Sequence, residues 1–150
     1  MAQFELHSFT PNDFDDFTPQ SMQEDEYMLF KKDRPIMLEY IEKEENTVTI
    51  TRNGKTIGVY GFIPLPEKGV HAWLFFAKGI KKSDMGVAVR MIKAGIAALE
   101  DLGYEWVQTP VRTDFPQGER LIKMLGFSDT EVEEDVFENG ITYKYWMRVL

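Results

Sequence analysis

The sequence predicts a mixed α/β domain with one mostly antiparallel sheet of six to seven strands, helices on both faces and one parallel pair of strands. Three observations predict this class. An apolar run at 70–77 leads through a basic loop into a long amphipathic helix that stops at Gly103. An Asn-Gly pair at 53–54 separates two segments of strand character. A further strand at 105–111 follows the helix, and a strand–helix–strand connection places it parallel to strand 70–77.

The run at 70–77 is expected to be a central strand, because both of its alternating faces are largely apolar. The helix that follows places an apolar stripe on one side, which we expect to face the sheet. The stripe consists of Met85, Val89, Ile92, Ile96, Leu99 and Leu102, while Arg90, Lys93, Glu100 and Asp101 lie away from it.

The first half of the chain begins with a short strand that carries Phe4, Leu6 and Phe9. Thr10 and Pro11 are typical of a helix cap and first position, so one or two short helices are expected up to about residue 32. A further helix is expected over about 35–43. Strands 47–52 and 55–63 then form a hairpin around a type I′ turn, and residues 64–69 form the next turn.

The last part of the chain is expected to hold a short helix and a second hairpin. Pro116 suits the first helical position, Leu121 to Leu125 supply a core face, and Gly126 is a left-handed stop after which Phe127 packs back. Strands at 131–137 and 141–149 flank a second Asn-Gly turn at 139–140.

Length and composition predict a single domain over 1–150, since 150 residues with 43% hydrophobic content can bury a sizeable core. The absence of cysteine excludes disulfides, thiolate nucleophiles and zinc–thiolate sites, and two histidines argue against a histidine-rich metal site. No apolar run approaches the roughly 18 residues that span a bilayer. The net charge of −8 disfavours nucleic acid and anionic membranes, so we expect a cytoplasmic protein that binds neither.

The charge is unevenly spread. Residues 10–46 hold eleven acids against four bases, and 128–140 hold six acids against none. Residues 78–123 reverse this with eight bases against six acids. The acidic segments suit a cationic substrate or are simply solvated.

The basic region starts at a candidate anion site at the beginning of the long helix. Ser83 suits the N-cap, and Gly86 and Ala88 leave the first turn almost without side chains. Free amides there, together with the helix dipole and the charges of Lys78, Lys81 and Lys82, suit a phosphate. The alternative is a capped surface helix whose small residues only allow close packing.

The order of elements resembles the GNAT superfamily, the GCN5-related acyl-CoA N-acyltransferases, over nearly the whole chain. The resemblance rests on three features: Gly54, Lys55, Ile57 and Gly58 in a hairpin, the strand, loop and helix at 70–102, and the segment Leu121 to Phe127 that ends in Leu-Gly-Phe.

The resemblance implies that the loop before the long helix binds the pyrophosphate of coenzyme A. The family's motif there runs Arg or Gln, two residues, Gly, one residue, then Gly or Ala; Ser83, Gly86 and Ala88 match its positions, and the leading Arg or Gln is absent. Strands 70–77 and 105–111 are expected to splay, so that the pantetheine arm pairs with backbone between them. The implied acetyl-CoA-binding residues are Phe76, Ala77, Lys78, Lys81, Lys82, Ser83, Gly86, Val87, Ala88 and Asp114.

The family's chemistry also requires a base for the amine and an acid for the thiolate that leaves. The Tyr common in its short helix falls at Ile122 here, and its usual Asn falls near Phe115, beside Asp114. His71 is the candidate base, and Tyr143 or Tyr145 is the candidate acid. Ordinary packing roles are the alternative for all three side chains.

Two functions therefore remain open. One is an acetyl-CoA-dependent N-acyltransferase, in which an amine such as a polyamine, an aminoglycoside or a protein lysine attacks directly. The other is a GNAT-like binding or structural module without turnover, as in similar small proteins of tailed phages. The apolar Val149 and Leu150 would suit a strand paired across a homodimer.

Overall fold

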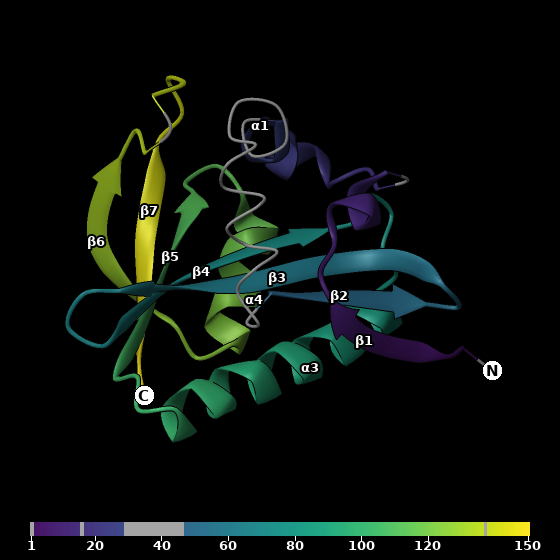
Figure 1. Cartoon of the computed structure of the whole chain (residues 1–150). Helices are drawn as coiled ribbons and strands as arrows, with labels where there is room; N and C mark the ends of the chain where they lie inside the picture. Colours follow the sequence, from purple (N-terminus) through teal and green to yellow (C-terminus); the bar gives the residue numbers. More distant parts are fainter. Residues whose placement is uncertain (1, 16, 29–46, 137) are drawn as a thin grey trace. The chain divides into compact units, whose positions relative to one another are not determined.

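The computed structural model describes residues 2–15, 17–28, 47–136 and 138–150 (Figure 1). Seven strands form one sheet in the order β1-β2-β3-β4-β5-β7-β6, which confirms the predicted mixed α/β class with a mostly antiparallel sheet of six to seven strands. The strands are β1 (Phe4–Ser8), β2 (Thr47–Arg52), β3 (Lys55–Leu65), β4 (Gly69–Phe76), β5 (Trp106–Arg112), β6 (Ser128–Glu134) and β7 (Tyr143–Val149). The helices are the 3-10 turns η1 (Pro11–Phe14) and η2 (Ser21–Gln23) and the α-helices α1 (Glu24–Met28), α3 (Lys82–Asp101) and α4 (Pro116–Met124).

The chain groups into two compact units. The first unit contains Met1–Ile63 and Trp73–Ala88, and the second contains Pro64–Ala72 and Val89–Leu150. Helix α3 therefore begins in the first unit and ends in the second. The helix expected over about 35–43 lies outside the described residues, whereas η1, η2 and α1 confirm short helices within 11–28.

The hairpin of the first unit follows the prediction. Asn53 and Gly54 have φ angles of 51° and 81°, as a type I′ turn requires, and Arg52 pairs with Lys55 across it. Strand β3 continues beyond the expected end, because Pro64 and Leu65 belong to the strand rather than to the turn. A proline can end a strand where its missing N–H is not required for pairing.

The core of the first unit is an aromatic cluster. Side chains from the sheet and from the segment after β1 meet in it, and they are Phe9, Phe14, Phe17, Tyr27, Val59, Trp73 and Phe75. Phe14 lies at its centre, with its ring centroid 5.0 Å from those of Phe9 and Tyr27. The predicted cap at Thr10 is present, and the Asp13 carboxylate accepts a bond of 2.8 Å from the Thr10 N–H.

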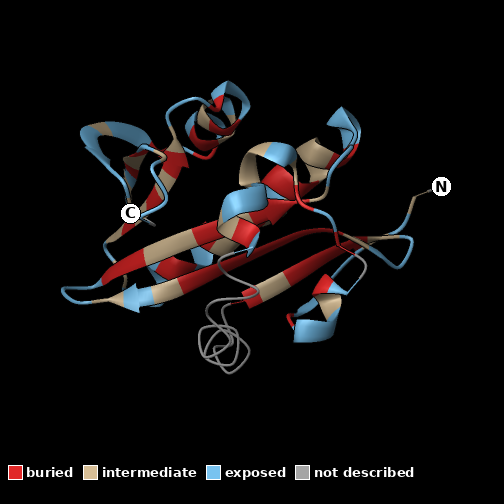
Figure 2. Cartoon of the chain, turned by 90° about the horizontal axis from the view of Figure 1, so that it is seen from above, coloured by how far each residue is buried: buried red, intermediate tan, exposed pale blue. Residues whose placement is uncertain are grey.

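The two helices that enter the second unit bury the predicted faces. Val89, Ile92, Ile96 and Leu99 of α3 are at most 4% exposed. Buried residues are red in Figure 2, and red covers much of the long strands of the sheet. Both helices end with left-handed glycines, Gly103 and Gly126, followed by the hydrogen bonds of a Schellman motif. Leu102 and Met124 were expected to be internal, but they are 67% and 56% exposed because they lie at or beyond the last helical turn.

The strands of the second unit pair in both directions. Gly69–His71 of β4 pairs in parallel with Trp106–Gln108 of β5, which confirms the parallel pair but limits it to three residues. Strand β7 pairs antiparallel with all of β5 and also with β6. The expected tight turn at 139–140 is wrong. β6 ends at Glu134 and β7 begins only at Tyr143, and between them the Asp135 carboxylate accepts bonds from the N–H groups of Asn139 and Gly140. In the described part of the chain no helix is long and apolar enough to cross a membrane.

Candidate functional site

Helix α3 begins at Lys82, two residues earlier than a Ser83 cap would allow. The Met85 N–H donates to the Lys81 carbonyl at 2.9 Å, which makes Lys81 the capping residue and places Ser83 inside the first turn. The prediction that Ser83 is the N-cap is therefore wrong. The amides of Lys82, Ser83 and Asp84 precede the first intrahelical donor, so they have no acceptor within the helix.

The surroundings of this first turn suit an anion. Lys78, Lys81, Lys82 and Ser83 are all exposed, so their polar groups face solvent. A Cβ built on Gly86 would meet no atom within 4 Å, which leaves open space over the turn. Ala88, two residues on, is fully buried and anchors the helix to the core. The structure thus brings the predicted lysines, Ser83, Gly86 and Val87 together at one helix end.

One acidic residue of the first turn is kept away from this open space. The Asp84 carboxylate lies 3.2 Å from Nε of Arg52 on β2, and its side chain is only 9% exposed. The ion pair ties the start of α3 to the sheet of the first unit. Sequence reasoning missed Asp84 and Arg52, because the two residues are far apart in the chain and no local pattern links them.

The backbone groups at the end of β4 and directly after it form hydrogen bonds alternately with β3 and with residues 18–23. The Ala77 N–H donates to the Ile57 carbonyl of β3 at 2.8 Å. Phe76 and Lys78, one residue to either side, bond instead with residues 18–23. Phe76, Ala77 and Lys78 therefore lie beside the basic loop as predicted, but the backbone of Phe76 and Lys78 already has partners from the chain itself.

The candidate base and acids lie on one face of three neighbouring strands in the second unit. His71 pairs with Gln108, and Gln108 pairs with Met147 of β7. Tyr145 is two residues from Met147, and Tyr143 is four. With a rise of about 3.3 Å per residue and about 4.8 Å between strands, the backbone of Tyr145 is roughly 12 Å from that of His71, and that of Tyr143 roughly 16 Å.

The environments of these groups differ. Burial lowers the pKa of His71, so its ring is neutral near pH 7 and is able to accept a proton. Burial, together with the charge of Glu134, raises the pKa of Tyr145, which keeps its hydroxyl protonated. Tyr143 has no exposed surface, so its hydroxyl is enclosed in the core. Tyr145, which is half-buried, is the better acid candidate.

The lowered pKa of His71 predicts a loss of stability in mild acid. Below the ordinary pKa of 6.5 the unfolded chain binds a proton at this histidine before the folded chain does. The free energy of unfolding therefore falls as the pH drops through that range. Urea unfolding at pH 7.5 and pH 5.5 should show a larger loss for the wild type than for His71→Gln. Equal losses would contradict a buried, neutral His71.

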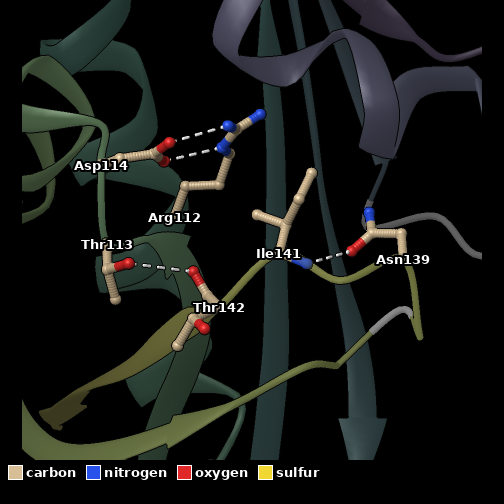
Figure 3. A network of polar contacts seen from close by, with 6 residues as sticks. All are labelled: Arg112, Thr113, Asp114, Asn139, Ile141 and Thr142. Atoms are coloured by element: carbon tan, nitrogen blue, oxygen red, sulfur yellow. Dashed lines mark hydrogen bonds and ion pairs between the residues drawn. The ribbon is translucent and has the colours of Figure 1, made fainter.

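Asp114 is an exposed partner of an arginine in the second unit. Its carboxylate accepts bonds of 2.8 and 2.9 Å from Nε and Nη2 of Arg112, which holds the pKa of Asp114 low (Figure 3). Figure 3 also shows Thr113 donating to the Thr142 carbonyl, which links this loop to the start of β7. Ile122 and Phe115, at the positions of the family's Tyr and Asn, are 7% and 8% exposed and pack in the core.

The comparisons with known proteins agree with this architecture. No protein-family model matches the sequence, and no curated protein sequence matches it. Solved structures do match: an acetyltransferase of the GNAT family from Streptococcus pneumoniae has a TM-score of 0.70 at 16% identity, with 99% of each chain covered. The chain has the GNAT fold.

Of two further structural neighbours, one was solved with CoA and the other is named for the substrate spermidine. A Bacillus subtilis acetyltransferase solved in complex with CoA matches with a TM-score of 0.64 at 18% identity, over 100% of this chain and 99% of that one. A chimera that includes the spermidine N-acetyltransferase of Vibrio cholerae matches with a TM-score of 0.71 at 17% identity, over 98% and 95%. Identities this low establish the GNAT fold alone.

Proposed function

We propose that this chain binds acetyl-CoA and transfers its acetyl group to an amine by direct attack. The observation that carries the proposal is the first turn of α3, where free amides, three exposed lysines and the open space over Gly86 converge. A diphosphate fits these groups, because its oxygens accept hydrogen bonds from amides and its charge is balanced by lysines. The CoA held by a neighbour of the same fold supports this choice of ligand.

The groups of the second unit supply the proton transfers in this proposal. Neutral His71 takes a proton from the incoming ammonium, which frees the nitrogen lone pair to attack the thioester carbonyl carbon. The carbon–sulfur bond breaks as the amide bond forms, the Tyr145 hydroxyl gives a proton to the departing thiolate, and the second proton that the nitrogen loses restores that hydroxyl. Arg112 holds Asp114 in place, and that carboxylate suits a cationic acceptor near the end of β5.

The acidic character of the chain favours a cationic acceptor. Residues 128–140 hold six acids and no base, and the described acids of β6 are exposed. Polyamines belong to the class of substrate that such a surface attracts, as in the neighbour named for spermidine. A cytoplasmic location, where acetyl-CoA is made and used, fits this proposal.

A second function is favoured by one specific observation. The position of the family's Tyr holds Ile122, which is packed in the core, so no hydroxyl is available from α4. A GNAT-like domain that binds a ligand or a partner without turnover, for example a phage accessory protein, needs no such acid.

Two measurements on the wild-type protein test the proposal. Acetyl-CoA at about 100 times its dissociation constant should raise the free energy of unfolding by about 2.7 kcal/mol, seen as an upward shift of Tm. Release of free thiol in the presence of a panel of amines, with polyamines included, then separates turnover from binding. A shift of Tm without thiol release would favour the binding module, and no shift at millimolar coenzyme would refute the coenzyme site.

A further inference from the structure

We propose that residues 18–23 are an internal strap that occupies the coenzyme-pairing edge of β4, and that acetyl-CoA displaces this strap when it binds. The inference rests on the proposed function, since it concerns access to the same ligand. All of the residues involved belong to the first unit.

The strap lies on the edge of β4 that faces away from β3. Backbone groups of successive residues in a strand point to opposite edges. The Ala77 N–H donates to the Ile57 carbonyl of β3, and the Phe75 carbonyl oxygen lies next to Gly58 of β3. Leu74, Phe76 and Lys78 therefore direct their backbone groups to the other edge.

Four hydrogen bonds hold the strap on that edge. The Lys78 N–H donates to the Thr18 carbonyl at 2.7 Å, and the Gln20 N–H donates to the Phe76 carbonyl at 3.0 Å. The Gln23 carboxamide makes the other two: it accepts from the Phe76 N–H at 3.0 Å and donates to the Leu74 carbonyl at 2.7 Å. A carboxamide carries the same donor and acceptor as a peptide group, so Gln23 acts as the next link of a pairing strand.

The ends of the strap are anchored independently of β4's edge. Phe17 and Tyr27, on either side of it, are 6% and 4% exposed and lie in the aromatic cluster, with their ring centroids 5.6 Å apart. The exposed Thr18, Ser21 and Glu24 lie between these anchors. The strap consists of the bridge residue Pro19, which is buried opposite Ala77, and the single turn η2, so it is a short segment that can leave the edge while the cluster stays packed.

A pantetheine arm can replace the strap and still supply hydrogen-bond partners for the backbone groups on this edge of β4. Leu74, Phe76 and Lys78 present two acceptors and two donors, and a buried backbone group without a partner is costly. The two amides of a pantetheine arm offer the same complement. Lys78 is three residues from Lys81, so an arm that extends from a diphosphate at α3 along this edge meets the strap.

Substitution of Gln23 tests the strap. Gln23→Ala removes two of the four bonds and leaves the backbone of residues 18–20 intact. Gln20→Ala is the matched control, because Gln20 bonds to β4 through its backbone. The ligands are acetyl-CoA and adenosine 3′-phosphate 5′-diphosphate, which carries the diphosphate but no pantetheine. Their dissociation constants are measured by calorimetry for wild type and both variants.

Acetyl-CoA should bind Gln23→Ala about 30-fold more tightly than wild type, since the closed state loses two hydrogen bonds, together worth about 2 kcal/mol. Affinity for the diphosphate fragment should stay the same in all three proteins, and Gln20→Ala should match wild type for both ligands.

The other outcomes separate the strap from the coenzyme site. Unchanged acetyl-CoA affinity in Gln23→Ala, with normal fragment binding, would overturn the strap and leave the proposed function standing. Failure of both ligands to bind any of the proteins would overturn the coenzyme site and, with it, the competition. Hydrogen exchange of the ligand-free wild type gives a test without substitution: amides of Phe76 and Lys78 that exchange as fast as those of an unpaired edge would also overturn the strap.

Discussion

Replacing Gly86 by glutamate is expected to weaken acetyl-CoA binding by about 100-fold or more while the protein stays folded. The Cβ of residue 86 enters open space, so the new carboxylate meets no protein atom near the backbone. It would lie beside the phosphates, where repulsion between unit charges about 4 Å apart amounts to a few kcal/mol near a protein surface. Isothermal calorimetry with acetyl-CoA measures the loss.

The control for this variant is Ala94→Glu, which adds the same charge at an exposed position of the same helix. Its affinity for acetyl-CoA should equal that of the wild type. Glutamate is a better helix former than glycine by somewhat less than about 1 kcal/mol, so Gly86→Glu should unfold no more easily than the wild type. Wild-type affinity in Gly86→Glu would exclude the first turn of α3 as the phosphate site.

Phe14→Ala is expected to lower the free energy of unfolding by about 3–5 kcal/mol, the usual cost of deleting a buried aromatic ring. Phe14 is 2% exposed, and its ring contacts those of Phe9, Phe17 and Tyr27. Removing it leaves a cavity that aromatic neighbours fill poorly. A loss of this size is a large part of the 5–15 kcal/mol that stabilises a typical domain.

Urea unfolding measures this difference, and Leu102→Ala is the control. Leu102 is 67% exposed, so its truncation should change stability by no more than about 0.5 kcal/mol. A loss below about 1 kcal/mol for Phe14→Ala would mean that the aromatic cluster is not the core of the first unit.

The features that sequence could predict are those with a local cause. Asn53 with Gly54, and the glycines at 103 and 126, occupy conformations with positive φ that few other residues adopt, so they fix turns and helix ends. The apolar stripe of α3 follows the helical period and is buried as expected. These signals were enough for the order of elements along the chain and for the GNAT fold.

The features that sequence could not predict depend on distant or competing partners. A turn at Asn139-Gly140 was expected to join two strands directly, but the Asp135 carboxylate binds the amides of both residues and the flanking strands stop short of the turn. The N-cap of α3 is Lys81 rather than Ser83, because the Lys81 carbonyl accepts the first hydrogen bond of the helix, from the Met85 N–H. Neither the contacts of Asp135 nor the position of the N-cap can be inferred from the residue types around them.

The candidate site likewise has parts that the sequence could predict and parts that it could not. The lysines and small residues at the start of α3 predicted an anion site from adjacent positions alone. The strap could not be predicted, because Gln23 lies in an acidic, polar segment and bonds to Leu74, 51 residues further along the chain. A glutamine in such a segment is most simply interpreted as solvated.

The terminal strand of the sheet has a consequence for how copies of this protein meet. Among the strands that the structure describes, β6 pairs with β7 alone, and six of its seven residues are exposed, four of them acidic. Glu131, in its middle, has a φ of 63°, which interrupts the regular spacing of backbone donors and acceptors. A second copy of the protein that approached the edge of β6 would meet carboxylates of like charge and an irregular row of backbone donors and acceptors. At neutral pH both features disfavour edge-to-edge stacking of copies into fibres.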